Sequence, residues 1–155
     1  LQTLQYKIIH RFFHCNYTLS IWFNDLRSVC QHFDCTGCVD NIQHYFCHCR
    51  SVSMFWRAFM KFWKDTTGFC FMLNEVDVIF GILNPFSDDN IDVLNHCILF
   101  AKQYIYQCKR DEKHICVFEF LVHLKNRMDI LCTVSILQNK HEKFLKKWFS
   151  LYNRF

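Results

Sequence analysis

Glycine and proline are almost absent from this chain, which holds three glycines and one proline in 155 residues. A β-sandwich needs many turns, and turns depend on these two residues, so their scarcity disfavours all-β folds and glycine-rich phosphate loops. Hydrophobic residues make up 52% of the chain, which excludes a disordered polypeptide because there is ample apolar surface to bury. We therefore expect an all-α, mostly helical fold and a single domain over residues 1–155.

Apolar residues recur at helical spacing in several segments of the chain. Gly68 is expected to end one helix, and Asn74 and Asp88 to begin others. In the segment 115–138 the expected apolar stripe is Phe118, Leu121, Leu124, Met128 and Leu131. The segments predicted to be helical are approximately 1–13, 18–26, 42–64 with a break near Cys49, 74–80, 91–108, 115–138 and 140–153.

Eleven cysteines need a separate explanation, because an odd number cannot form a complete set of intramolecular disulfides. Seven are scattered singly, Cys30 among them, and we expect most of these to be buried thiols in a reducing compartment. The other four lie within fifteen residues of one another, together with two histidines. The crowded group is Cys35, Cys38, His44, Cys47, His48 and Cys49.

The spacing of this group predicts a structural zinc site. A Cys-x-x-Cys turn lets Cys35 and Cys38 reach one ion, and His44 and Cys49 complete a tetrahedral Cys₃His set. The zinc-binding loop and helix would occupy residues 30–64. Four protein ligands leave no open position for a water molecule, so we expect a non-catalytic site.

The identity of the fourth ligand stays open at this level. Residues five apart on an ideal α-helix point about 140° apart, so Cys49 is expected past a helix end or in a distorted turn. His48 is a rival, since it lies four residues after His44 and would face the same side of a helix. Cys47 and His32 are weaker rivals.

These motifs resemble the zinc-binding domain that follows the reverse transcriptase in LINE-type (non-LTR) retrotransposons. The resemblance implies a part of a larger polyprotein, in keeping with a chain that begins at Leu1 rather than methionine. It also implies an accessory domain that helps to hold template RNA or target DNA beside the upstream polymerase. The matching positions are Cys35, Cys38, His44, Phe46, Cys49, Phe55 and Trp56. In this chain the spacer between Cys38 and His44 is shorter than in many members of that family.

A net charge of +4 permits a polyanionic partner without requiring one. Tyr45 could stack on an unpaired base. A protein-interaction module docking on the polymerase, or a decayed copy that keeps only the fold, is the alternative. No run of the sequence is apolar enough for a membrane span, and we expect an intracellular protein. The residues proposed to contact nucleic acid are Arg50, Arg57, Lys140, Lys143 and Lys147.

Overall fold

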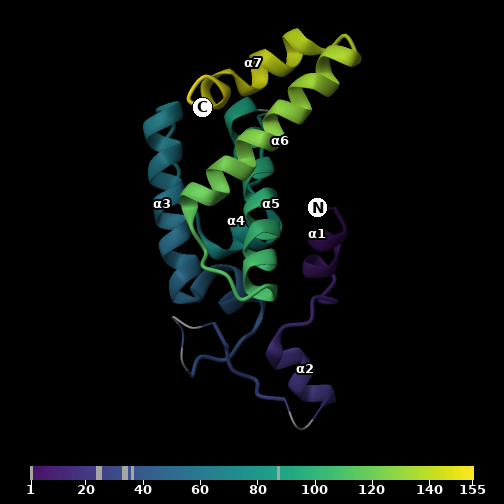
Figure 1. The fold of residues 1–155 in the computed structure, drawn as a ribbon, viewed down its shortest axis with the longest axis vertical. Coiled ribbons are helices and arrows are strands. Elements are labelled where there is room, and N and C mark those ends of the chain that lie inside the picture. The colour runs from purple at the N-terminus through teal and green to yellow at the C-terminus, as the bar shows by residue number, and fades with distance from the viewer. Residues whose placement is uncertain (1, 24–25, 33–34, 36, 87) are drawn as a thin grey trace.

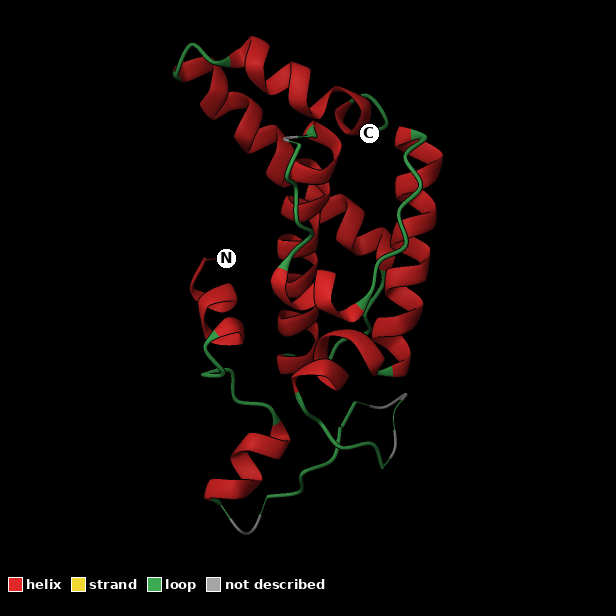
Figure 2. Ribbon diagram, turned by 180° about the vertical axis from the view of Figure 1, so that it is seen from behind, coloured by secondary structure: helices red, strands yellow, loops and turns green. Residues whose placement is uncertain are grey.

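The computed structural model describes residues 2–23, 26–32, 35, 37–86 and 88–155. Within these residues the chain forms seven α-helices and one π-helical turn, η1. Figures 1 and 2 show their arrangement from two sides. The elements are α1 (Gln2–Ile9), α2 (Asn16–Trp22), η1 (His44–His48), α3 (Arg50–Thr67), α4 (Glu75–Phe80), α5 (Asp89–Arg110), α6 (Val117–Leu137) and α7 (His141–Tyr152).

The predicted all-α fold class is confirmed. Among the described residues the only β-type pairing is one antiparallel bridge between Val29 and Val39, and no strand is present (Figure 2). None of the helices in the described part of the chain combines the length and apolar character of a membrane-spanning segment.

The body of the molecule is built on α3, α5 and α6, with α7 crossing one end (Figure 1). Helix α6 contacts both α3 and α5, and α7 contacts all three. Aromatic rings fill the space between these helices: Phe55 and Phe59 of α3 meet the edge of Phe120 of α6 at 5.3 and 5.6 Å between centroids. Such edge-to-face pairs add to the burial of the rings themselves.

The apolar stripe of α6 begins at a different residue from the one expected. Phe118 was predicted to face the core, but its side chain is 76% exposed, and Phe120 is buried in its place. Phe120, Leu124 and Met128 follow one another at four-residue spacing on the face that meets α3 and α5. Both Phe118 and Phe120 fit an apolar stripe at helical spacing, so the sequence does not distinguish them. The positions of α3 and α5 determine that Phe120 is the buried one.

The predicted helix ends are confirmed at three places. Gly68 ends α3 in the left-handed region with φ of 71°, which glycine adopts without a side-chain clash. Asn74 and Asp77 form a capping box at the start of α4. The Asp88 carboxylate accepts a hydrogen bond from the Asn90 amide at the start of α5.

The first two helices are shorter than expected. Helix α1 ends at Ile9 rather than near residue 13, and Arg11 follows with φ of 58°. Helix α2 ends at Trp22, and none of its residues is buried. Five of the scattered cysteines are buried, whereas Cys116 is half-buried and Cys70 is exposed. The five buried thiols are Cys15, Cys30, Cys97, Cys108 and Cys132.

A buried lysine joins three helices. Lys102 of α5 is only 1% exposed, and its ammonium donates hydrogen bonds to the side-chain oxygen of Gln5 and to the carbonyl of Ile79. Gln5 also donates to the Ile79 carbonyl at 2.9 Å. Burial lowers the pKa of Lys102 from 10.5 to about 8, although the nearby Cys47 thiol acts in the opposite direction. The charged form is therefore disfavoured by folding.

Replacing Lys102 with Met should remove a pH dependence of stability. Below pH 8 both the folded and unfolded chains carry the charge, and the folded state bears the full cost of burying it. Between about pH 8 and 10.5 the unfolded chain holds the proton more tightly, so stability rises with pH by on the order of 3 kcal/mol. Urea unfolding of wild type and Lys102→Met with reductant measures this. If the free energies of unfolding of wild type and Lys102→Met differed by a constant amount from about pH 8 to 10.5, the prediction would be contradicted.

Candidate metal centre

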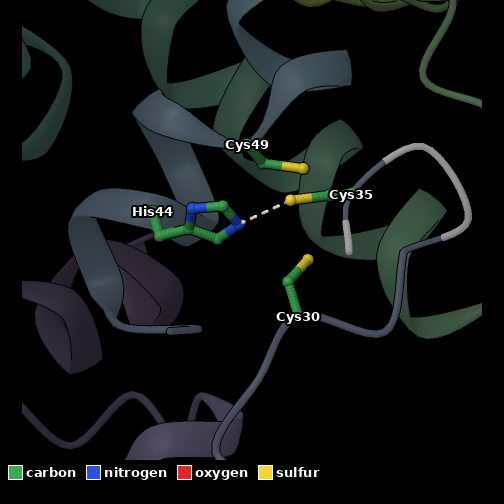
Figure 3. Close-up of side chains that lie close together, drawn as sticks. All are labelled: Cys30, Cys35, His44 and Cys49. Atoms are coloured by element: carbon green, nitrogen blue, oxygen red, sulfur yellow. Dashed lines mark hydrogen bonds between the residues drawn. The ribbon is translucent and has the colours of Figure 1, made fainter. Parts of the chain in front are cut away.

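Four metal-ligating side chains converge at one end of the helical body. Cys30, Cys35, His44 and Cys49 are all buried, and their ligand atoms all lie within 4.8 Å of one another. Figure 3 shows the three sulfur atoms and the His44 ring pointing toward a common centre. The Nε2 atom of His44 lies 3.4 Å from the sulfur of Cys35.

The π-helical turn η1 places His44 and Cys49 on the same side of the chain. The amide of Cys49 donates a 2.9 Å hydrogen bond to the carbonyl of His44, five residues earlier. On an α-helix these side chains would diverge, but the wider π-helical turn brings them into near alignment. The distortion that we expected near Cys49 is therefore this turn.

Hydrogen bonds and packing hold η1 in place. The amide of His44 donates to the side-chain oxygen of Asn41 at 2.8 Å, which satisfies one of the free donors at the start of the turn. The indole of Trp56 on α3 donates to the carbonyl of Phe46 at 2.7 Å. Phe46 itself is fully buried. These contacts position His44 and Cys49 against α3 and fix the start of η1 to Asn41.

The other two ligands come from the loop before η1. The bridge between Val29 and Val39 folds this loop back, and the amide of Cys30 donates to the carbonyl of Cys38 at 2.8 Å. Cys30 is thereby carried into the cluster, while Cys38 is exposed and lies outside it. The structure thus brings together Cys35, His44 and Cys49 of the predicted set, with Cys30 in the place expected for Cys38.

Cys30 gave little signal in the sequence. It lies five residues before Cys35, outside the Cys-x-x-Cys motif, and its inclusion depends on a backbone pairing that no side-chain pattern marks. One signal was present in the spacing. The spacer between Cys38 and His44 is shorter than in many members of the family that the chain resembles, whereas Cys35 lies nine positions before His44.

The rival ligands are not among the four clustered residues. His48 is exposed and lies 3.0 Å from the carboxylate of Glu75 on α4. Burial raises the pKa of the Cys47 thiol to about 12, and the other charges that act on it belong to Glu75 and Lys102, away from the cluster. His32 is buried, and its Nδ1 lies 3.4 Å from the Ser51 hydroxyl.

The electrostatics of the four groups are strongly coupled. A hydrogen bond between the Cys30 and Cys49 side chains lowers the pKa of Cys49 and raises the pKa of Cys30. Burial raises the pKa of Cys35, and the adjacent Cys38 thiol raises it further. Burial also lowers the pKa of His44, which favours the neutral imidazole that a metal requires.

The donor set and its spacing fit a metal ion. A tetrahedral site with sulfur ligands at ~2.3 Å places neighbouring ligand atoms ~3.8 Å apart, so a contraction of about 1 Å at most would close this cluster. Buried thiols and one imidazole suit soft or borderline metals rather than calcium or magnesium. The Cys₃His cluster can therefore hold a metal ion.

The predicted nucleic-acid contacts fall into two groups. Arg50 and Arg57 are exposed on α3, which begins beside the cluster. Lys140 and Lys143 are exposed at the start of α7, at the opposite end of the body (Figure 1). Lys147 of α7 is half-buried and forms a 3.1 Å ion pair with Asp92 of α5.

Tyr45 is not arranged to receive a base. The Lys109 ammonium lies 4.2 Å from the centre of its ring, and the edge-to-face partner Phe13 lies 4.9 Å away, centroid to centroid. The ring that we expected to be available for stacking is therefore covered by other parts of the chain.

No model of a known protein family matches this chain, and no curated protein matches it either.

Serine substitutions at Cys30 and at Cys38 should show whether the metal binds the Cys₃His cluster or the Cys-x-x-Cys motif. Cys30→Ser removes a ligand and should lower Co²⁺ or Zn²⁺ affinity at least ~100-fold, whereas Cys38→Ser should leave it nearly unchanged. The intensity of the thiolate-to-cobalt absorption reports the number of sulfur ligands in each variant. Loss of binding in Cys38→Ser with retention in Cys30→Ser would contradict this assignment.

Proposed function

We propose that this chain is a zinc-stabilised, nucleic-acid-binding accessory domain of a retrotransposon reverse transcriptase polyprotein. The single observation that carries the proposal is the buried Cys₃His cluster at the end of a helical body. It supports the resemblance to the zinc-binding domain of LINE-type elements, in which a Cys-x-x-Cys, a His and a further Cys precede a Phe-Trp pair, with the departure that Cys30 here takes the place of Cys38. Here that pair is Phe55 and Trp56, both buried in α3.

Zinc would act as a structural cross-link. Two of its ligands, Cys30 and Cys35, lie in a loop with little helical structure, while His44 and Cys49 are fixed by η1 and α3. A bound ion would join these two parts and supply binding energy that adds to the folding free energy. All four positions around the ion would be filled by protein, which favours a non-catalytic role.

Removing the metal should destabilise the protein. Structural zinc binds the folded state far better than the unfolded chain, so its removal should lower the melting temperature by on the order of 10 °C or more. The loss should be restored by adding Zn²⁺ but not Mg²⁺, because thiolates prefer the softer ion. Scanning calorimetry with and without a chelator measures this, and identical melting curves would contradict a structural zinc site.

The nucleic-acid part of the proposal is supported by a line of exposed cations on α3. The line consists of four basic side chains. At 100° per residue they fall within an arc of about 60° and extend over about 20 Å along the helix. No ion pair involving them occurs among the described residues. Such a stripe attracts phosphates by releasing counterions, without reading bases. The stripe consists of Arg50, Arg57, Lys61 and Lys64.

Charge removal from this stripe should weaken RNA binding in a salt-dependent way. We expect Arg57→Gln/Lys61→Gln to reduce the affinity for single-stranded RNA about tenfold and to reduce the salt slope by about one unit. Lys140→Gln/Lys143→Gln removes the same charge from the second group of predicted contacts, at the start of α7, and shows whether the loss is specific to α3. Fluorescence anisotropy between about 50 and 200 mM salt measures both. Equal losses from the two double variants would contradict a specific role for the α3 stripe.

A second function is favoured by α2. Three large apolar residues at its end, Ile21, Trp22 and Phe23, are 62%, 59% and 57% exposed. A patch of exposed apolar side chains of this kind is typical of a protein-interaction site. Docking of α2 on the upstream polymerase is thus the alternative role. Absence of RNA binding by the wild-type chain at low salt would favour it over the α3 stripe.

A further inference from the structure

Lys109, in the last turn of α5, has a buried ammonium group with no hydrogen-bond partner among the described residues. Its Nζ lies 4.2 Å from the centre of the Tyr45 ring, in a cation–π contact. An ammonium group removed from water without a hydrogen bond or a counter-charge is costly. The position therefore favours a negative charge nearby.

The metal-ligand cluster lies next to this ammonium. Tyr45 directly follows the ligand His44, and Lys109 and Cys30 line the same pocket of about 460 Å³. The Lys109 charge also acts on the cluster. The hydrogen bond between Cys30 and Cys49 is the larger effect on both thiols: it lowers the pKa of Cys49, in the same direction as the Lys109 charge, and raises the pKa of Cys30, against it. Burial lowers the pKa of His44, and the Lys109 charge acts in the same direction.

Charge balance links the Lys109 ammonium to the metal-ligand cluster. A divalent ion bound by three thiolates and a neutral imidazole carries a net charge of −1. We propose that the Lys109 ammonium is the counter-charge of the loaded metal centre, held beside it by α5, and that it raises the affinity of the cluster for the ion. The proposal rests on the proposed zinc site and deepens it, because it assigns a positioning residue outside the four ligands.

Asp40 is the rival counter-charge for Lys109. It is buried and lines the same pocket, and its Oδ1 atom has no hydrogen-bond partner among the described residues. Its Oδ2 atom accepts a hydrogen bond from the Asn16 amide at 3.2 Å. No ion pair joins Asp40 to Lys109 within the part of the chain that the structure describes. The geometry leaves the Lys109 charge available to the cluster.

The test compares Lys109→Met with Arg110→Gln. The Arg110 side chain is an exposed neighbour whose guanidinium is already paired with Asp111 at 2.7 Å, so its removal takes away one charge without uncovering a buried site. Competition with a chromophoric chelator gives the Zn²⁺ affinity of each full-length chain. We expect Lys109→Met to bind Zn²⁺ on the order of ten- to a hundredfold more weakly, and Arg110→Gln to bind within about twofold of wild type.

A merely structural role for Lys109 predicts a different pattern. Loss of packing alone would lower the urea midpoint equally with and without Zn²⁺. Loss of the counter-charge should instead lower the midpoint only in the zinc-loaded protein, and leave the metal-free midpoint unchanged or higher because an uncompensated charge has gone. Lys109→Gln, which is closer in polarity, repeats the measurement should Lys109→Met fold poorly.

The Asp40→Asn background separates the two counter-charges. Lys109→Met should still weaken Zn²⁺ binding by a similar factor there, and loss of the effect would assign Lys109 to Asp40 and overturn the inference. Equal Zn²⁺ affinity of Lys109→Met and the wild type would overturn it as well. Failure of the wild-type chain to bind Zn²⁺ at all would overturn the proposed zinc site itself, so the two failures are distinguishable.

Discussion

The hydrogen bond from the Cys49 amide to the His44 carbonyl, 2.9 Å long, defines the turn on which the metal centre depends. It closes a π-helical turn instead of an α-helical one, so two side chains five residues apart face the same point. Phe46 lies inside this turn, and its carbonyl accepts a hydrogen bond from the Trp56 indole N–H. The same residues thus form half of the ligand set and join it to the aromatic core of α3.

The loop that supplies the other half is held by hydrogen bonds of its own and by α2, whose Asn16 side chain donates to the Val29 carbonyl at 3.0 Å. The bridge between Val29 and Val39 folds it back, and the amides of Cys30 and Cys35 donate to the carbonyls of Cys38 and His32, both at 2.8 Å. A bound ion would add a direct link between this loop and η1. Such a link is common in small structural zinc sites, where metal binding and local folding are one event.

Basic side chains of the molecule differ in their surroundings. Exposed cations follow one side of α3 away from the cluster, where they are solvated and free to meet phosphates. Lys109 is different, because its ammonium is buried beside Tyr45 and acts on the cluster rather than on solvent. On α7, Lys147 is already paired with Asp92, which reduces its availability to a polyanion. Residues of one charge type thus stand in three different environments: exposed on α3, buried beside Tyr45, and ion-paired on α7.

The sequence by itself determined the helical fold class and most helix ends, because scarce glycine and proline, apolar spacing and capping residues such as Asn74 act locally. It also placed Cys35, His44 and Cys49 in one neighbourhood. Only the tertiary structure decided that Cys30 rather than Cys38 joins them, and that Phe120 rather than Phe118 enters the core. Those choices depend on which chain segments pair and on where the neighbouring helices lie, and residue spacing alone does not encode either.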